Sequence, residues 1–128
     1  MSFWMKLGIE ISDLAVFKNT CRNQDIEYHA NQDSNFKFRG APVEATLSLK
    51  GVSGVGAYLT REGGGFKLHM DNDTNYSRFS NKIGANGGRL TRDYSVGVIK
   101  KQVGASGGMV NMVTEQPDGS MLMRVSTM

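Results

Sequence analysis

Positively charged side chains gather in one stretch of the sequence, between residues 76 and 104. This stretch holds six lysines and arginines and a single acidic residue, Asp93, so its net charge is +5, whereas the rest of the chain carries −2. Concentrated positive charge attracts phosphate backbones and acidic protein surfaces, and it raises the rate of association with both. We therefore expect a partner to bind here. The candidate contact residues are Arg78, Lys82, Arg89, Arg92, Lys100 and Lys101.

Two classes of partner fit this charge. The aromatic residues Tyr76, Phe79 and Tyr94 lie in the same stretch, where their rings are available for stacking on bases, which favours nucleic acid. However, solvent-facing helices are commonly charged, and Tyr94 also belongs to an apolar stripe that we expect to be buried. We expect a protein partner, with nucleic acid as the alternative.

Two loops begin like known ligand sites but lack essential positions. The glycine-rich residues 84–91 lead into a predicted helix, yet the phosphate-loop spacing G-x-x-x-x-G-K-[ST] is absent. We therefore expect a flexible connector, which together with the basic helix forms the contact surface for the partner. Residues 71–75 supply oxygen ligands as a calcium loop does, but Tyr76 stands where that loop needs glycine and Lys82 where it needs glutamate. A helix-capping loop is the simpler interpretation.

Cysteine and histidine, which serve most often in zinc sites and nucleophilic catalysis, are sparse in the sequence. The single cysteine, Cys21, excludes an intrachain disulfide and a cysteine-based zinc site, and its place on an apolar stripe predicts a core residue. His29 and His69 lie in separate predicted strands, on the polar face of each, and no third ligand accompanies them. We expect both to be exposed strand residues. We expect no catalytic residues, no metal and no cofactor, and hence a protein that is not an enzyme.

The candidate contact residues must be positioned by helices and strands. Segments that alternate apolar and polar residues with period two predict the strands. They are expected over residues 4–11, 43–50, 55–59 and 66–70, and a glycine-rich link over 61–65 predicts a hairpin between the last two. A second hairpin is expected near the end of the chain, where Gln116-Pro117-Asp118-Gly119 has the composition of a turn.

Two segments have helical spacing instead. Leu14, Phe17 and Cys21 form one apolar stripe, capped by Ser12 or Asp13, and predict a helix that ends near Asn23. A second helix is expected from about Arg89 to Val103, and a shorter helical turn over 76–83. The C-terminal cap of the second helix is expected at Gly104. The residues that recur on one face of this helix are Leu90, Tyr94, Gly97, Val98 and Lys101.

The order of these elements predicts an α+β fold, with two main helices on one face of an antiparallel sheet in a ferredoxin-like arrangement. A chain of 128 residues is the length of one ordinary domain, so we expect residues 1–128 to fold as a single domain. The sequence contains no apolar run long enough to cross a bilayer and no pattern of a signal peptide, which predicts a cytoplasmic protein with no membrane partner.

The C-terminal segment is rich in methionine. Thioether side chains adapt to irregular surfaces, so the second hairpin is a candidate protein interface. Because Met121 and Met123 share one strand face and Met112 lies within reach of it, we expect these three to form a buried layer.

Four short blocks resemble one protein family. They are residues 36–40 (Phe-Lys-Phe-Arg-Gly), 65–71, 90–94 and 115–120. Together they are similar to the domain-of-unknown-function family one-two-five-seven, small proteins of cyanobacteria, algal plastids and some bacterial viruses. The resemblance implies a fold and a group of source organisms. The short length and the abundance of Gly, Asn, Ser and Met suit an accessory protein encoded by a phage, and we expect a host or phage protein as its partner and the host cytoplasm as its location if a phage encodes it. The resemblance implies no catalytic residues.

The chain departs from this family at two places. Ser2-Phe3 replaces the Ser-His-Phe expected near the start, and Asn72-Asp73 follows Asp71 where relatives carry tryptophans. No ligand site near residue 71 is therefore carried over from the family.

Overall fold

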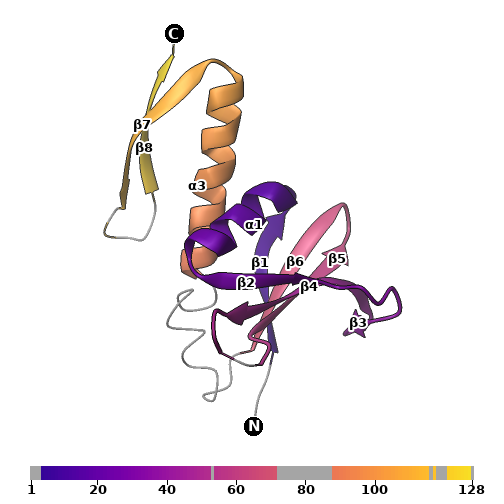
Figure 1. The fold of residues 1–128 in the computed structure, drawn as a ribbon. Helices are drawn as coiled ribbons and strands as arrows, with labels where there is room; N and C mark the ends of the chain where they lie inside the picture. Colours follow the sequence, from indigo (N-terminus) through magenta and orange to yellow (C-terminus); the bar gives the residue numbers. More distant parts are fainter. Residues whose placement is uncertain (1–3, 53, 72–87, 116, 118–120, 128) are drawn as a thin grey trace.

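The computed structural model describes residues 4–52, 54–71, 88–115, 117 and 121–127 (Figure 1). The elements of the first half are β1 (Trp4–Ile11), α1 (Leu14–Asn23), β2 (Ile26–Ala30), β3 (Lys37–Phe38), β4 (Ala41–Leu49), β5 (Ala57–Glu62) and β6 (Gly65–Asp71). Those of the second half are α3 (Gly88–Ala105), β7 (Gly108–Glu115) and β8 (Met121–Thr127). The predicted helical turn over 76–83 lies outside the described residues, as do Arg78 and Lys82.

The first six strands form one sheet, in the order β1-β6-β5-β4-β2, with β3 paired to β4 outside that path. All of these pairings are antiparallel. The α+β class predicted from the sequence is therefore confirmed. The ferredoxin-like arrangement is not, because β1 and β2, which flank α1 in the chain, lie at opposite edges of the sheet, and β7 and β8 form a separate two-stranded sheet.

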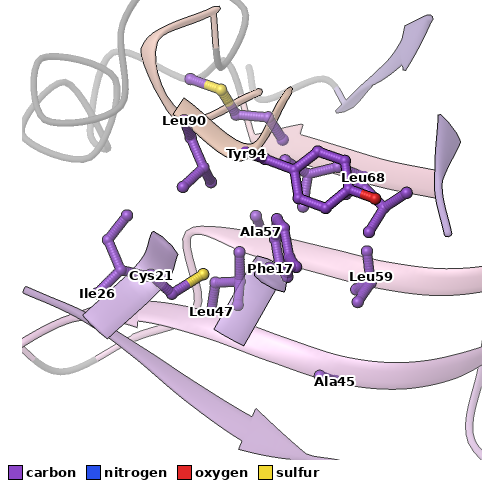
Figure 2. Packing of buried hydrophobic residues seen from close by; sticks show 12 residues of the cluster. Phe17, Cys21, Ile26, Ala45, Leu47, Ala57, Leu59, Leu68, Leu90 and Tyr94 are labelled. Carbon is purple, nitrogen blue, oxygen red and sulfur yellow. The ribbon is translucent and has the colours of Figure 1, made fainter. Parts of the chain in front are cut away.

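One face of the large sheet carries the hydrophobic core (Figure 2). The Phe17 ring of α1 lies at its centre and makes edge-to-face contacts with Tyr28 and Tyr94, at centroid distances of 6.3 and 6.0 Å. Alternation along β4 and β5 supplies the sheet side of the core. Its fully buried members include Ile11, Cys21, Ala45, Leu47, Ala57, Leu59, Leu68 and Leu90.

Two tight turns fix the strand register. Glu62 pairs with Gly65, and Gly63 between them has a φ of 63°, so the predicted β5–β6 hairpin is confirmed with a two-residue turn. A second such turn, at Arg39 and Gly40 with φ values of 51° and 82°, connects β3 to β4. Positive φ at both central residues gives the turn whose twist matches that of the flanking strands.

The helix α1 agrees with its prediction. Asp13 is its N-cap, with a carboxylate oxygen that accepts a hydrogen bond from the Val16 N–H at 3.1 Å, and the helix ends at Asn23. No helix in the described part of the chain is long and apolar enough to span a membrane.

The helix α3 also forms as predicted but continues past Gly104, so the predicted C-cap at that glycine is wrong. The helix ends at Ala105, and the residue with positive φ is Gly107, at 83°. The Ser106 N–H still donates to the Gln102 carbonyl in the helical manner. A glycine need not end a helix, and the chain reverses only where a left-handed conformation is required.

Only the first half of α3 covers the large sheet. Leu90 and Tyr94 enter the core, whereas the second half extends beyond the sheet and has β7 alongside it (Figure 1). The two helices therefore share one face of the sheet at their crossing, and the rest of α3 supports the β7–β8 hairpin.

Candidate functional site

The four predicted contact residues that are described all lie on α3, but they do not form one cluster. Arg89 is exposed in the first turn and Arg92 is half-buried, whereas Lys100 and Lys101 are exposed in the second half. From Arg89 to Lys100 the helix rises by roughly 16 Å, at about 1.5 Å per residue. The positive charge is therefore divided between the two ends of the helix.

A cleft of about 710 Å³ lies between α1, α3 and β7 and brings Lys100 and Lys101 together with side chains from α1. Its apolar walls come from Val16, Val96 and Val113, among others. The polar residues that line it are Asn19, Thr20, Asn23, Gln24, Asp93, Lys100 and Lys101.

Close contact between the two helices forms the floor of this cleft. A Cβ atom built at Gly97 would lie 2.8 Å from Cγ1 of Val16 and 3.9 Å from Oγ1 of Thr20. The glycine thus lets α1 approach the backbone of α3, which explains why the predicted apolar stripe contains a residue without a side chain. The cleft lies beside this crossing, and Val113 of β7 contributes to its lining.

Amide side chains from α1 line the cleft opposite α3. Gln24 donates from Nε2 to Oδ2 of Asp93 at 2.5 Å, which ties the end of α1 to α3. Its Oε1 atom is buried and has no hydrogen-bond partner among the described residues. A buried amide oxygen of this kind accepts a hydrogen bond from a ligand at little cost, because it has already lost its water.

The two lysines of the cleft differ in their surroundings. Lys101 donates to Oδ2 of Asp13 at 2.7 Å, and this bond, followed by the one from the Val16 N–H, lowers the pKa of the Asp13 carboxyl below its ordinary value. Lys100 is exposed and forms no ion pair with a described residue. Lys101 therefore stabilises the contact between α1 and α3, and Lys100 is the cation available to a ligand.

Tyr94 of α3 also bonds to the segment that precedes α1. The Tyr94 hydroxyl accepts hydrogen bonds from the backbone N–H groups of Ser12 and Asp13, both at 3.0 Å. These groups precede α1 and have no partner within the helix. Tyr94 is thus a buried structural residue, as its place in the apolar stripe predicted, and its ring is not available for stacking on bases.

His69 lies on the sheet face opposite the core, as predicted, but the prediction that it is exposed is wrong. Its side chain is 5% exposed, and its Nε2 atom lies 2.9 Å from Oγ1 of Thr60 and 3.0 Å from Oε2 of Glu62. The Phe38 ring packs edge-on against it at 5.2 Å. Phe38 belongs to β3, which folds over this face, and the alternation of Phe36 and Phe38 before a turn was the available signal.

The remaining candidates for chemistry are separated in space. His29 is exposed, as predicted, and the strand register places Thr46 and Tyr58 between it and His69. Cys21 is buried, and desolvation raises its pKa to about 12, so it is the core residue that was predicted. The described residues contain no group of three or more metal-ligating side chains.

The amides of the cleft were not predicted from the sequence. Asn19 and Asn23 are spaced i, i+4, which places them on one side of α1, near Val16 and Thr20, which face Gly97 of α3. That spacing was a detectable signal. What it did not indicate is that a strand from the far end of the chain, β7, would form the third wall.

Comparison of the chain with protein-family models, with curated proteins and with solved structures finds no match. The resemblance to the domain-of-unknown-function family stays a prediction.

Proposed function

We propose that this protein is a small non-enzymatic binding protein that holds an acidic segment of a protein partner against α3 and the adjoining cleft. The observation that carries this proposal is the pairing of an available cation with amides. Lys100 lies in one cleft with Asn19, Asn23 and the unpartnered Oε1 atom of Gln24. A peptide presents carboxylates, carbonyl groups and N–H groups, and these side chains complement all three.

The charge of the cleft favours a protein over a nucleic acid. Asp93 lines the cleft, and Asp13 neutralises Lys101 at its margin, so the positive potential there is weaker than the sequence suggests. A phosphate backbone needs a run of unopposed cations, whereas a peptide with mixed polar groups tolerates a neighbouring carboxylate. Nucleic acid remains the alternative partner, through Arg89 and Lys100 and the predicted contacts at Arg78 and Lys82.

The wider setting of this function rests on the sequence resemblance. It favours an accessory protein of a phage or a cyanobacterium, acting in the cytoplasm of the host cell, with a host or phage protein as its partner.

Capture from a host lysate tests the proposal. Both side chains are exposed, so the double variant Arg89→Glu/Lys100→Glu should lose the captured protein while staying folded by circular dichroism. Lys37→Glu is the matched control, an exposed cation on β3 that should leave capture unchanged. Mass spectrometry quantifies the captured protein. Equal capture by the wild type, the double variant and Lys37→Glu would place the contact surface elsewhere.

A titration with fluorescent single- and double-stranded nucleic acid separates the two partner classes. If nucleic acid is the partner, binding should be detectable at low salt, weaken steeply as salt increases and disappear in the double variant. If a protein is the partner, the wild type should bind nucleic acid no more tightly than the double variant does.

A further inference from the structure

The β7–β8 hairpin has two faces that differ in burial. Strand register assigns Val110, Val113 and Met123 to one face, and all three are half-buried where β7 packs along α3. A bulge between Val110 and Met112 preserves this division along the strand. The opposite face, called here the outer hairpin face, consists of Met109, Met112, Thr114, Leu122, Arg124 and Ser126, and every one of these residues is exposed.

The outer hairpin face is too apolar for ordinary surface. Met109, Met112 and Leu122 are 64, 48 and 60% exposed and account for half of the six exposed large hydrophobic residues of the described chain. The predicted buried layer is therefore wrong for Met112, which points away from α3. Large apolar side chains gathered on one exposed face mark a site of association.

One charge lies in the middle of this face. Arg124 pairs with Met112, between the pair Met109–Ser126 and the pair Thr114–Leu122. It is exposed and forms no ion pair with a described residue. A second copy of this chain, packed about a two-fold axis through the face, would bring two guanidinium groups together, which disfavours a symmetric dimer.

The molecule itself shows which element covers such a hairpin. A helix already packs on the inner side of this hairpin, where α3 lies along β7 (Figure 1). Two strands about 4.8 Å apart present a face about as wide as one α-helix. From Met109 to Thr114 the outer face extends roughly 17 Å at about 3.3 Å per residue, the length of a helix of about 12 residues.

We propose that the outer hairpin face binds an amphipathic helix of a partner protein, one whose apolar stripe contains an acidic residue that pairs with Arg124. The apolar part of that stripe covers Met109, Met112 and Leu122. This surface lies on the far side of β7 and β8 from the α3 cleft and does not depend on the function proposed for that cleft.

Synthetic helices test this proposal on the full chain. The probes are labelled amphipathic peptides of about 18 residues with glutamate, glutamine or lysine at the centre of one leucine stripe, and fluorescence anisotropy reports binding. The glutamate peptide should bind about tenfold more tightly than the lysine peptide, because only the first complements Arg124. Arg124→Glu should reverse that order, Met112→Gln should weaken all three peptides, and Lys37→Glu should change nothing.

Three results would overturn the proposal. The first is equal binding of the three peptides, or none, to a wild-type chain that is folded by circular dichroism. The second is a dimer in sedimentation analysis that Met112→Glu dissociates, which would assign the face to a second copy. The third is slow oxidation of Met109 and Met112 by dilute peroxide in the free monomer, which would mean that another segment of the same chain covers the face.

Discussion

The sheet half of the molecule and the half built from α3 and the hairpin bury their side chains very differently. Through Tyr94, fully buried residues recur in nearly every element, and Phe17 connects α1 to the sheet. Beyond Tyr94, none of the described side chains is buried. Yet this second part contains the C-terminal half of α3 and a regular hairpin. The contrast indicates that the first part supplies most of the free energy of folding through its buried side chains. The second part presents exposed surface.

The two parts differ in where their unpartnered polar atoms lie. On the covered outer face of the sheet, beneath Phe38, Nε2 of His69 lies within hydrogen-bond distance of Thr60 and Glu62, and its Nδ1 atom is buried without a partner among the described residues. In the cleft, the Oε1 atom of Gln24 likewise has no described partner, and Lys100 forms no ion pair with a described residue. Of these two places, only the cleft presents such groups on a concave surface, where they favour a ligand.

The largest expected effect is a difference in stability between truncations in the two parts. Phe17→Ala removes a fully buried ring from the core and should lower the unfolding free energy by about 3–5 kcal/mol. Leu122→Ala removes a side chain that is 60% exposed and should change it by less than about 0.5 kcal/mol. Denaturant unfolding followed by circular dichroism measures both. Similar losses would erase the distinction between the two parts.

A pair of glycines within α3 locates the boundary between the parts. Gly97→Ala should destabilise by about 1–3 kcal/mol, because the added methyl group meets the rigid Val16 side chain. Gly104→Ala should stabilise by about 1 kcal/mol, because nothing lies within 4 Å of its added carbon and alanine favours the helix. Thermal unfolding of the two variants gives the comparison, and the same sign for both would place the close approach elsewhere.

High pH should lower the free energy of unfolding through Cys21, which lies in the core of the sheet half. Burial raises its pKa from 9.0 to about 12, so above pH 9 the unfolded chain loses a proton that the folded chain keeps. Unfolding is then favoured, by on the order of 1 kcal/mol at pH 10. Stability should therefore fall between pH 9 and 12 more steeply in the wild type than in Cys21→Ala. Parallel curves would show that the thiol is accessible to water in the folded state.

The smallest effect concerns Asp13, where the two parts meet. Its pKa is lowered by the bond from Lys101, so the stability it contributes is present above pH 3.8 and lost as the pH falls through its folded-state value. Asp13→Asn keeps the helix cap and loses only the ion pair, whereas Asp13→Ala loses both. Unfolding at neutral pH should rank the wild type first, Asp13→Asn second and Asp13→Ala last. Equal stabilities of the two variants, both below the wild type, would contradict this ranking and make the ion pair the dominant contribution.

Local patterns predicted most of the fold. Period-two alternation located β1, β4, β5 and β6, and the stripe Leu14, Phe17 and Cys21 located α1, because one face of each element is buried. The failures concern contacts between distant segments. The strand order, the burial of His69 beneath β3 and the exposure of Met112 depend on which element covers which face, and no local period encodes that.

The candidate site was predicted only in part for the same reason. Charge density drew attention to α3, and Lys100 and Lys101 do line a cleft. The sequence did not indicate that Asp13, distant in the chain, would pair with Lys101, or that α1 would supply the amides. A charge count treats the cations as equivalent, whereas packing distinguishes them.

Site-specific photo-crosslinking in a host lysate tests the binding role of the α3 half most directly. A benzophenone amino acid at Asn23, which is exposed at the cleft, should crosslink to a protein, and the added change Lys100→Glu should abolish that product. The same group at Lys37, on β3 of the sheet half, should give no such product. Equal crosslinking from the two positions, or a product from Asn23 that persists in Lys100→Glu, would contradict the assignment of partner binding to the cleft.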